Sequence, residues 1–390
     1  MSRLKSQRIA FITTMAGFPW GGSEFLWSMA AEQALLQGHE VLIAIHDWSV
    51  NHPRIVQLQQ KGAKLLLRPN SPQLSLPLKI VKKLSQHSLL SKLVKTKSYY
   101  QPVFDWKPDV ICISQGGTFD VAFLPDLFSL LKSSSIPYVL VSQFNSDTYL
   151  LNDTGRSIAQ KVVANAASIA FVSDNNWKLT ERQLAQTVAN AVVVQNPANL
   201  DDLSIVPWPW QSVACFACVA RLDAVTKGLD VLFESLSASS WRMRDWQCSI
   251  YGTGPDRDYL QALAEHYKIS DRIRFMGHAE DVRSIWSENH LLILPSRAEG
   301  TSLALLEAML CGRPAIVTDV GDSARWVEES KTGFVADAPT VKSLGAALSR
   351  AWMARDNWKL IGIRSHESAI AKFDRSPGQQ LLTLILDAVK

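Results

Sequence analysis

The sequence lacks the long apolar runs and the cysteine pairs that mark membrane-spanning or disulfide-linked proteins. No stretch of its 390 residues approaches the ~20 apolar positions that a transmembrane helix needs. The apolar segment 9–18 precedes a Gly-rich turn and an amphipathic helix, so it predicts a buried strand and not a signal peptide. The five cysteines are odd in number and lie in apolar segments, which indicates reduced thiols and a cytoplasmic protein. Cys215 and Cys218 have the spacing of a redox pair, but their apolar surroundings predict core positions.

Several motifs of metal and dinucleotide enzymes are also missing. There is no His-Glu-x-x-His helix and no paired Cys/His set with zinc spacing. No Gly-x-Gly-x-x-Gly opens the first helix, as a dehydrogenase of this composition would require. Asp256-Arg257-Asp258 has the letters of a metal-binding Asp-x-Asp motif, but it begins a predicted helix, where the dipole favours acids in any case. We therefore expect neither a metal nor a bound cofactor.

Acidic residues are absent from residues 48–104, which contain ten Lys and Arg. Residues 1–200 carry 19 Lys/Arg against 12 Asp/Glu, whereas the remainder carries 21 against 24. The first half therefore offers a positive surface to anionic partners. Within it, residues 79–97 mix cations with apolar residues and could either rest on an anionic membrane or form an ordinary solvated helix. Nucleic acid is not expected, because no recognition motif is present and the second half is acidic.

Short β-branched runs alternate with helical patterns along the whole chain, and most are continuously apolar, as in parallel strands covered on both faces. The expected strands are residues 8–14, 40–46, 64–68, 109–114, 138–142, 168–173 and 192–195, then 212–220, 247–252, 272–276, 291–295 and 315–318. The length suits two cores, so the fold class is α/β with two Rossmann-like domains facing across a cleft.

The boundary between the domains is expected in residues 196–211, a proline-containing segment without periodicity. This divides the chain into residues 1–196 and 197–375. Residues 376–390 contain a C-terminal helix that could return to the first domain. Ligands of such sheets bind beyond the carboxyl ends of the strands, so the chemistry is expected in the loops that face the cleft.

The strongest motif is Pro-Ser-Arg-Ala-Glu-Gly-Thr-Ser-Leu-Ala-Leu-Leu-Glu-Ala-Met at residues 295–309. It follows an expected strand and opens a helix that ends near Gly312. Thr301 or Ser302 is the expected N-cap. The amides from Gly300 to Leu303, with the helix dipole behind them, suit a pyrophosphate.

Two glutamates flank this helix start. Glu307 lies about five residues into the helix, ~7.5 Å along its axis, where a carboxylate can accept hydrogen bonds from both hydroxyls of a ribose. Glu299, in the preceding loop, could hold hydroxyls of a sugar. Either residue could instead be a solvated charge, but Glu307 lies within the apolar run 303–310, which favours a function.

These residues resemble the family 4 glycosyltransferases, whose two glutamates separated by seven residues match Glu299 and Glu307. The resemblance extends over most of residues 212–336. It implies the two-Rossmann GT-B fold and transfer of a sugar from a nucleotide sugar with retention of anomeric configuration. The motif at residues 219–222, followed by residues 227–230, looks like the family's diphosphate-binding loop. The resemblance assigns Arg221 and Lys227 to the leaving diphosphate, whose growing negative charge two cations can stabilise.

Further loops match the family less specifically. Gly252 and Gly254, in Tyr-Gly-Thr-Gly-Pro, resemble the loop that lines the nucleotide pocket. His278 follows the next strand and is either a base contact or a simple loop residue. Gly21 and Gly22 resemble the glycine pair that closes over the donor phosphates from the opposite domain, although a turn alone would also explain two glycines.

One departure from the family lies after the fifth expected strand. Family members commonly place a histidine there, facing the sugar, whereas residues 141–147 contain none. Gln143 or Asn145 could replace that contact with an amide. His46, after the second strand, is a second candidate for acceptor contact.

The sequence thus predicts a hexosyltransferase-type, metal-independent glycosyltransferase that moves a sugar from a nucleoside-diphosphate sugar to a hydroxyl group. The acceptor could be a glycan, a lipid-linked molecule or a small molecule. Its catalytic residues would be Arg221, Lys227 and Glu299. A sugar-nucleotide epimerase of the same architecture and a non-catalytic sugar-nucleotide-binding protein are the alternatives.

Overall fold

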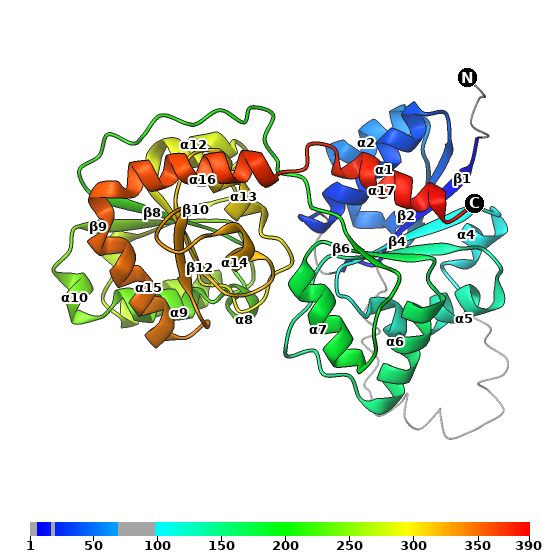
Figure 1. The fold of residues 1–390 in the computed structure, drawn as a ribbon, viewed down its shortest axis with the longest axis horizontal. Helices are drawn as coiled ribbons and strands as arrows, with labels where there is room; N and C mark the ends of the chain where they lie inside the picture. Colours follow the sequence, from blue (N-terminus) through cyan, green and yellow to red (C-terminus); the bar gives the residue numbers. More distant parts are fainter. Residues whose placement is uncertain (1–5, 17–19, 69–97) are drawn as a thin grey trace.

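The computed structural model describes residues 6–16, 20–68 and 98–390. Two parallel sheets form two side-by-side domains (Figure 1). The N-terminal sheet has the order β3-β2-β1-β4-β5-β6-β7, and the C-terminal sheet has the order β10-β9-β8-β11-β12-β13. Every pairing within both sheets is parallel, as the continuously apolar strands predict. The predicted fold class is confirmed.

The strands of the N-terminal sheet are β1 (Arg8–Thr13), β2 (Glu40–His46), β3 (Lys64–Arg68), β4 (Val110–Gln115), β5 (Tyr138–Ser142), β6 (Ser168–Phe171) and β7 (Ala191–Val193). Its described helices are α1 (Ser23–Leu36), α2 (Pro53–Gln60), α4 (Gln101–Asp105), α5 (Pro125–Ser133), α6 (Asp153–Asn165) and α7 (Asp174–Leu184). Helices cover both faces of the sheet, which separates two apolar clusters, one on each side.

The strands of the C-terminal sheet are β8 (Ala214–Val219), β9 (Trp246–Tyr251), β10 (Ile273–Gly277), β11 (Leu291–Leu294), β12 (Ala315–Thr318) and β13 (Gly333–Ala336). The helices after β8 are α8 (Ala224–Lys227), α9 (Leu229–Leu236), α10 (Ser239–Arg242), α11 (Arg257–His266), α12 (Val282–Glu288), α13 (Leu303–Leu310), α14 (Ser323–Trp326), α15 (Val341–Met353), α16 (Trp358–Lys372) and α17 (Pro377–Asp387). β13 was not predicted, because its four residues are too few to show a period.

The last helix returns to the N-terminal domain. α17 lies against α1, so the two ends of the described chain share one domain (Figure 1). Leu381, Leu382 and Ile385 are buried in the same cluster as Leu26 and Trp27 of α1. The C-terminal domain is therefore tied to the first domain by two chain crossings, one before β8 and one after α16.

We expect Gly378→Ala to lower the free energy of unfolding by about 1–3 kcal/mol, because the added methyl overpacks a helix contact. A Cβ at Gly378 would lie 2.6 Å from Cβ of Met29 on α1. Gly345→Ala in α15 is the matched control, since nothing lies within 4 Å of its Cβ position. The control should be neutral or stabilising, as alanine favours helix. Denaturant unfolding measures both; equal stability of the two variants would contradict close packing of α17 on α1.

Candidate active site

The loops that follow the parallel strands of both domains meet between them. The side chain of Leu303, the first residue of α13, lies 3.1 Å from the Cβ position of Gly22 at the start of α1. The Thr301 hydroxyl donates to the backbone carbonyl of Val172, which follows β6. The predicted glycine pair and the predicted helix start are thus brought together from opposite domains, as ligand binding at the carboxyl ends of the strands requires.

The beginning of α13 is open to a ligand. Ser302 is the N-cap, but no side chain caps the helix amides. Such uncapped N–H groups, at the positive end of the helix dipole, form a ready site for an anion. Thr301, the other predicted cap, uses its hydroxyl in the domain contact.

Glu307 lies inside α13 with 6% of its surface exposed. Its carboxylate accepts a hydrogen bond from the backbone amide of Asn199, in the connection between the domains, but burial outweighs that bond and raises its pKa to about 7. No described cation forms an ion pair with it. A buried, acceptor-rich group of this kind suits a ligand that brings its own donors, such as a diol.

Glu299 and Lys227 contact each other directly. The Lys227 Nζ lies 2.7 Å from Glu299 Oε1, and the same oxygen accepts a 2.7 Å hydrogen bond from the Ser296 hydroxyl. The side chain of Glu299 is 8% exposed and that of Lys227 is 22% exposed. Two residues that are 72 positions apart in the sequence therefore form one polar centre beside the start of α13.

A clamp holds the short helix that carries Lys227. Arg297 pairs with both carboxylate oxygens of Asp230 at 2.7 Å and donates to the Ala224 carbonyl at 2.6 Å. These bonds tie α8 and α9 to the loop after β11. Gly228, between the two helices, has φ +64° and leaves no room for a Cβ beside the Pro295 carbonyl. The position of Lys227 is therefore fixed from both sides.

Arg221 lies at the beginning of the same loop, 41% exposed, and pairs with Asp223 at 2.6 Å. Asp223 is also the N-cap of α8, since its side chain accepts from the Thr226 amide. Arg221 and Lys227 thus flank α8, with Arg221 oriented by the residue that starts the helix.

Gly252 and Gly254 serve a close approach of two loops. A Cβ at either glycine would overlap the backbone carbonyl of Ala220 or Leu222, after β8. Backbone bonds from Leu222 N to Thr253 O and from Asp256 N to Leu222 O join the same loops. These glycines shape the floor of the predicted nucleotide pocket. His278, after the edge strand β10, is exposed.

A set of polar contacts latches the domains together next to this centre. Ser173 donates to Asp322 at 2.8 Å, and Asn175 donates to the Gly321 carbonyl at 2.7 Å. Gly300 packs so tightly that a Cβ would overlap the Gln143 carbonyl oxygen. The donor loop and the N-terminal domain therefore fit without space for a larger residue at Gly300.

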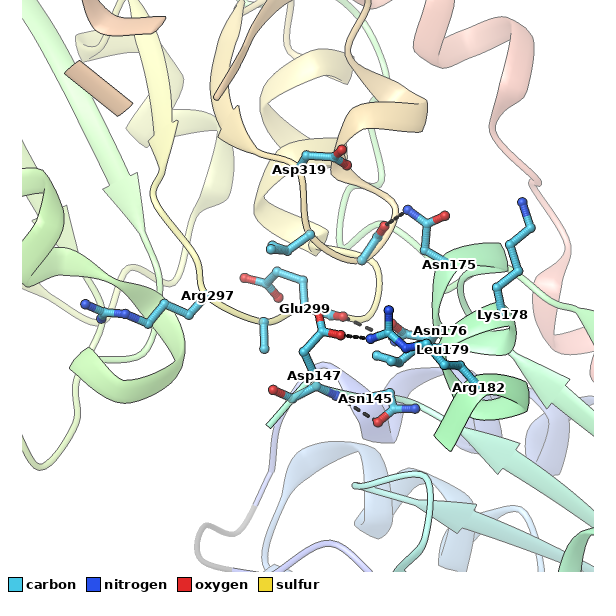
Figure 2. A pocket seen from close by; sticks show the side chains of 14 residues that line it. Asn145, Asp147, Asn175, Asn176, Lys178, Leu179, Arg182, Arg297, Glu299 and Asp319 are labelled. Carbon is cyan, nitrogen blue, oxygen red and sulfur yellow. Dashed lines mark hydrogen bonds and ion pairs between the residues drawn. The ribbon is translucent and has the colours of Figure 1, made fainter. Parts of the chain in front are cut away.

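A pocket of about 350 Å³ opens between the domains beside this latch (Figure 2). Glu299 and Asp319 reach it from the C-terminal domain, and Asn175 and Lys178 of α7 line the opposite wall. The pocket is polar and borders the Lys227–Glu299 centre, so a sugar-sized group could contact both domains here.

The three predicted acceptor residues do not form one cluster. Asn145 donates to Thr180 and Gln183 at 3.0 and 2.8 Å, so its amide supports the neighbouring helix. Gln143 accepts from Asn196 at 3.0 Å and has a buried Nε2 without a partner among the described residues.

His46, the third of them, ends β2, three strand positions from β5. That separation is about 14 Å at the usual spacing of strands. His46 packs beside Trp48, and burial followed by the charge of Arg68 lowers its pKa. One small acceptor group could not touch both His46 and Gln143.

Asp120 is a cleft residue that the sequence did not indicate. Its carboxylate accepts from Thr14 at 2.6 Å and from the Gly117 amide at 3.1 Å, and burial raises its pKa. It lies near enough to Tyr149 to raise the pKa of that phenol, as does Asp223 from the other domain. A lone aspartate in a short turn gives no periodic signal, so only the fold reveals it.

The described chain carries no cluster of metal-binding side chains. Within residues 6–16, 20–68 and 98–390, no group of three or more His, Cys, Asp or Glu lies together as a metal site. Asp256, from the Asp-x-Asp pattern, accepts a hydrogen bond from the Ala224 amide. No helix in that part of the chain is both long and apolar enough to cross a membrane. Residues 79–97, the predicted membrane segment, lie outside the described residues.

Comparison with known proteins places these features in a family. Residues 214–353 match the family described as "Glycosyl transferases group 1". The chain is 29% identical over 185 residues to one component of the phosphatidylinositol N-acetylglucosaminyltransferase of Homo sapiens, which is 47% of this chain and 37% of that protein. It is 29% identical over 201 residues to the alpha-D-kanosaminyltransferase of Streptomyces kanamyceticus, or 51% and 48% of the two chains. The matched regions span less than half of the length of these relatives.

Solved structures share the fold of nearly the whole chain. HepE of Anabaena in complex with UDP has a TM-score of 0.71 at 16% identity, covering 97% of this chain and 100% of that chain. The sucrose-phosphate synthase of Thermosynechococcus elongatus has a TM-score of 0.72 at 17% identity, covering 98% of each. The fold is therefore the GT-B arrangement of two Rossmann-like domains. The chain belongs to the family 4 glycosyltransferases, through the sequence match of its C-terminal domain, and the resemblance drawn from Glu299 and Glu307 is confirmed.

Proposed function

We propose that this protein is a retaining glycosyltransferase that moves a sugar from a nucleoside-diphosphate sugar to a hydroxyl group of an acceptor. The observation that carries the proposal is the Lys227–Glu299 contact beside the uncapped start of α13, with the buried Glu307 one turn farther in. A cation, open amides and two carboxylates at these places match the parts of a nucleotide sugar one by one. The epimerase and the non-catalytic alternatives are not favoured, because the named relatives are transferases.

Each group has one role in this proposal. The amides from Gly300 to Leu303, with Gly21 and Gly22 opposite, surround the diphosphate. Lys227 and Arg221 stabilise the charge that grows on the leaving oxygen as the bond to the anomeric carbon breaks. Glu307 holds the ribose.

The reaction then proceeds on one face of the sugar. Glu299 holds the sugar hydroxyls while the acceptor hydroxyl attacks from the side that the diphosphate leaves, and the acceptor proton passes to the diphosphate. These charges require no metal, and the domain latch keeps water from the donor. We further propose a cytoplasmic location.

Thermal unfolding with UDP, GDP, ADP and dTDP tests the donor. A ligand at about 100 times its dissociation constant should add about 2.7 kcal/mol to the free energy of unfolding, which gives a visible melting shift. One base should stabilise the chain more than the others, since a shaped pocket discriminates among bases. No shift with any of the four nucleotides would contradict the proposed donor site.

Product analysis with a radiolabelled sugar of the matching nucleotide then separates the three functions. Sugar transferred to an acceptor supports the transferase. An epimerised nucleotide sugar would indicate the epimerase, and binding without turnover across glycan, lipid-linked and small acceptors would indicate the binding protein.

A further inference from the structure

A second pocket, of about 660 Å³, lies in the C-terminal domain away from the cleft. Ala214, which begins β8, and Asp245, which precedes β9, both line it. It therefore lies at the amino ends of the strands, whereas the predicted donor loops follow the carboxyl ends. Strands of six residues span about 20 Å, so the two sites are on opposite edges of the sheet.

Arg244 is held rigidly in this pocket by aromatic rings. Its guanidinium carbon lies 4.4 Å from the ring centroid of the buried Trp241 and 5.1 Å from that of Trp352. Arg272 fixes the turn beneath, donating to the backbone carbonyls of Arg244 at 2.7 Å and of Arg242 at 3.1 Å. Stacking and turn together orient the guanidinium before any ligand arrives.

The charge of Arg244 has no counterpart. Among the described residues no carboxylate pairs with it, and its buried Nη1 has no hydrogen-bond partner. A second guanidinium, that of Arg355, lies 5.2 Å from the same Trp352 ring, and its nearest acid is Asp356, 3.7 Å away and 92% exposed. Asp245 on the rim pairs with neither arginine. Burial and then the charge of Arg355 lower the pKa of Arg244, as expected where two like charges share one pocket.

We propose that this pocket binds a phosphate group, either of a soluble phosphomonoester or of a phospholipid head group. Two guanidinium groups offer paired N–H donors that match phosphate oxygens, and an anion would satisfy the orphaned donor and relieve the repulsion. Met243, which lines the pocket and is 90% exposed, provides apolar surface for the remainder of the molecule. The site does not depend on the proposed transferase activity.

Calorimetric titration of the full chain with inorganic phosphate and with glycerol 3-phosphate tests the soluble form. UDP and GDP are present in excess, so that the cleft is filled. Arg244→Gln should weaken binding about tenfold or more, because hydrogen bonds to a charged group are lost. Arg364→Gln, an exposed arginine of α16, is the matched control and should bind like the unaltered chain. Flotation with phosphatidylglycerol or phosphatidylcholine vesicles tests the lipid form on the same three proteins.

Binding of either phosphate source that falls in Arg244→Gln and persists in Arg364→Gln supports the proposal, and the arm that responds identifies the source. Absence of binding in both arms for the unaltered chain, or equal binding by Arg244→Gln, overturns it. The nucleotide-induced melting shift of Arg244→Gln should be unchanged, which shows that the variant is folded and separates this site from the donor site.

Discussion

Lys227→Ala should lower kcat about 10²–10³-fold, the usual effect of removing one group that stabilises charge in the transition state. Lys227 is positioned by the Arg297–Asp230 clamp and is 22% exposed, so solvent only partly screens its charge. Because the leaving oxygen gains charge only as the bond breaks, the loss should fall on kcat more than on KM. Initial rates with labelled donor measure both constants. Lys359→Ala, an exposed residue of α16, is the control and should keep full activity.

The ion pair complicates a single substitution at Lys227. Removing the ammonium leaves the Glu299 carboxylate, which is 8% exposed, with only the Ser296 hydroxyl as a direct partner. Some of the lost activity could then come from a displaced Glu299. The double variant Lys227→Ala/Glu299→Gln separates the two effects through a mutant cycle. If the lysine stabilises the diphosphate, the double variant stays as slow as Lys227→Ala. A recovery of kcat in the double variant, or an unchanged kcat in the single one, would rule out that role.

The fold was largely predictable because its strands are short, apolar and parallel. The predicted bounds of residues 40–46, 64–68, 138–142 and 315–318 coincide with β2, β3, β5 and β12. Such strands are buried on both faces, so each is a continuous apolar run between polar helices. β13 escaped prediction because Gly333–Ala336 is short and lies at the sheet edge. Order and pairing of the strands followed from the handedness of the crossovers.

The candidate site was predictable where one loop carries it. Glu299, the helix start and Glu307 lie within nine residues of sequence, so their spacing alone implies a shared location. Contacts between distant segments gave no such signal. The hydroxyl of Thr301 bonds to Val172, 129 positions away, and the amide of Asn145 is used by Thr180. A side chain that is free to bind a ligand and one that supports the fold look alike until the partner is placed beside it.

The same limit applies to charge. Arg297 lies within the motif at residues 295–309, but its sequence position suggests no role, and only its bonds to Asp230 reveal that it positions Lys227. Sequence patterns indicate which residues face a loop, whereas the fold decides which of them pair. Burial is likewise a property of the fold, and it has the largest consequence at Glu307.

Glu307→Gln should raise the dissociation constant of the nucleotide donor about 10- to 100-fold, since hydrogen bonds to a charged group contribute about 1.5–3 kcal/mol. Glutamine keeps the shape of the side chain but has a single carbonyl acceptor for the two ribose hydroxyls. The Asn199 amide can still bond to that carbonyl, so the fold should hold. Calorimetric titration with the nucleoside diphosphate that gives the largest melting shift measures the change.

The pH dependence of donor binding tests the same residue more sharply. In the free protein, burial raises the pKa of Glu307 to about 7, so the carboxyl is protonated below that pH. Two ribose hydroxyls stabilise the ionised form, so binding lowers this pKa and releases a proton. Affinity should therefore rise with pH up to about 7 and level off above it, and this dependence should vanish in Glu307→Gln.

Glu24 is the control for that titration, because burial also raises its pKa to about 7 while it bonds to Thr13 beneath the first loop. Glu24→Gln should retain the pH dependence of donor affinity, since its carboxyl has a protein partner in the free chain. If the dependence instead disappears in Glu24→Gln and survives in Glu307→Gln, the proton released on binding comes from beneath the glycine loop. The ribose would then have to be held by a group other than the carboxylate inside α13.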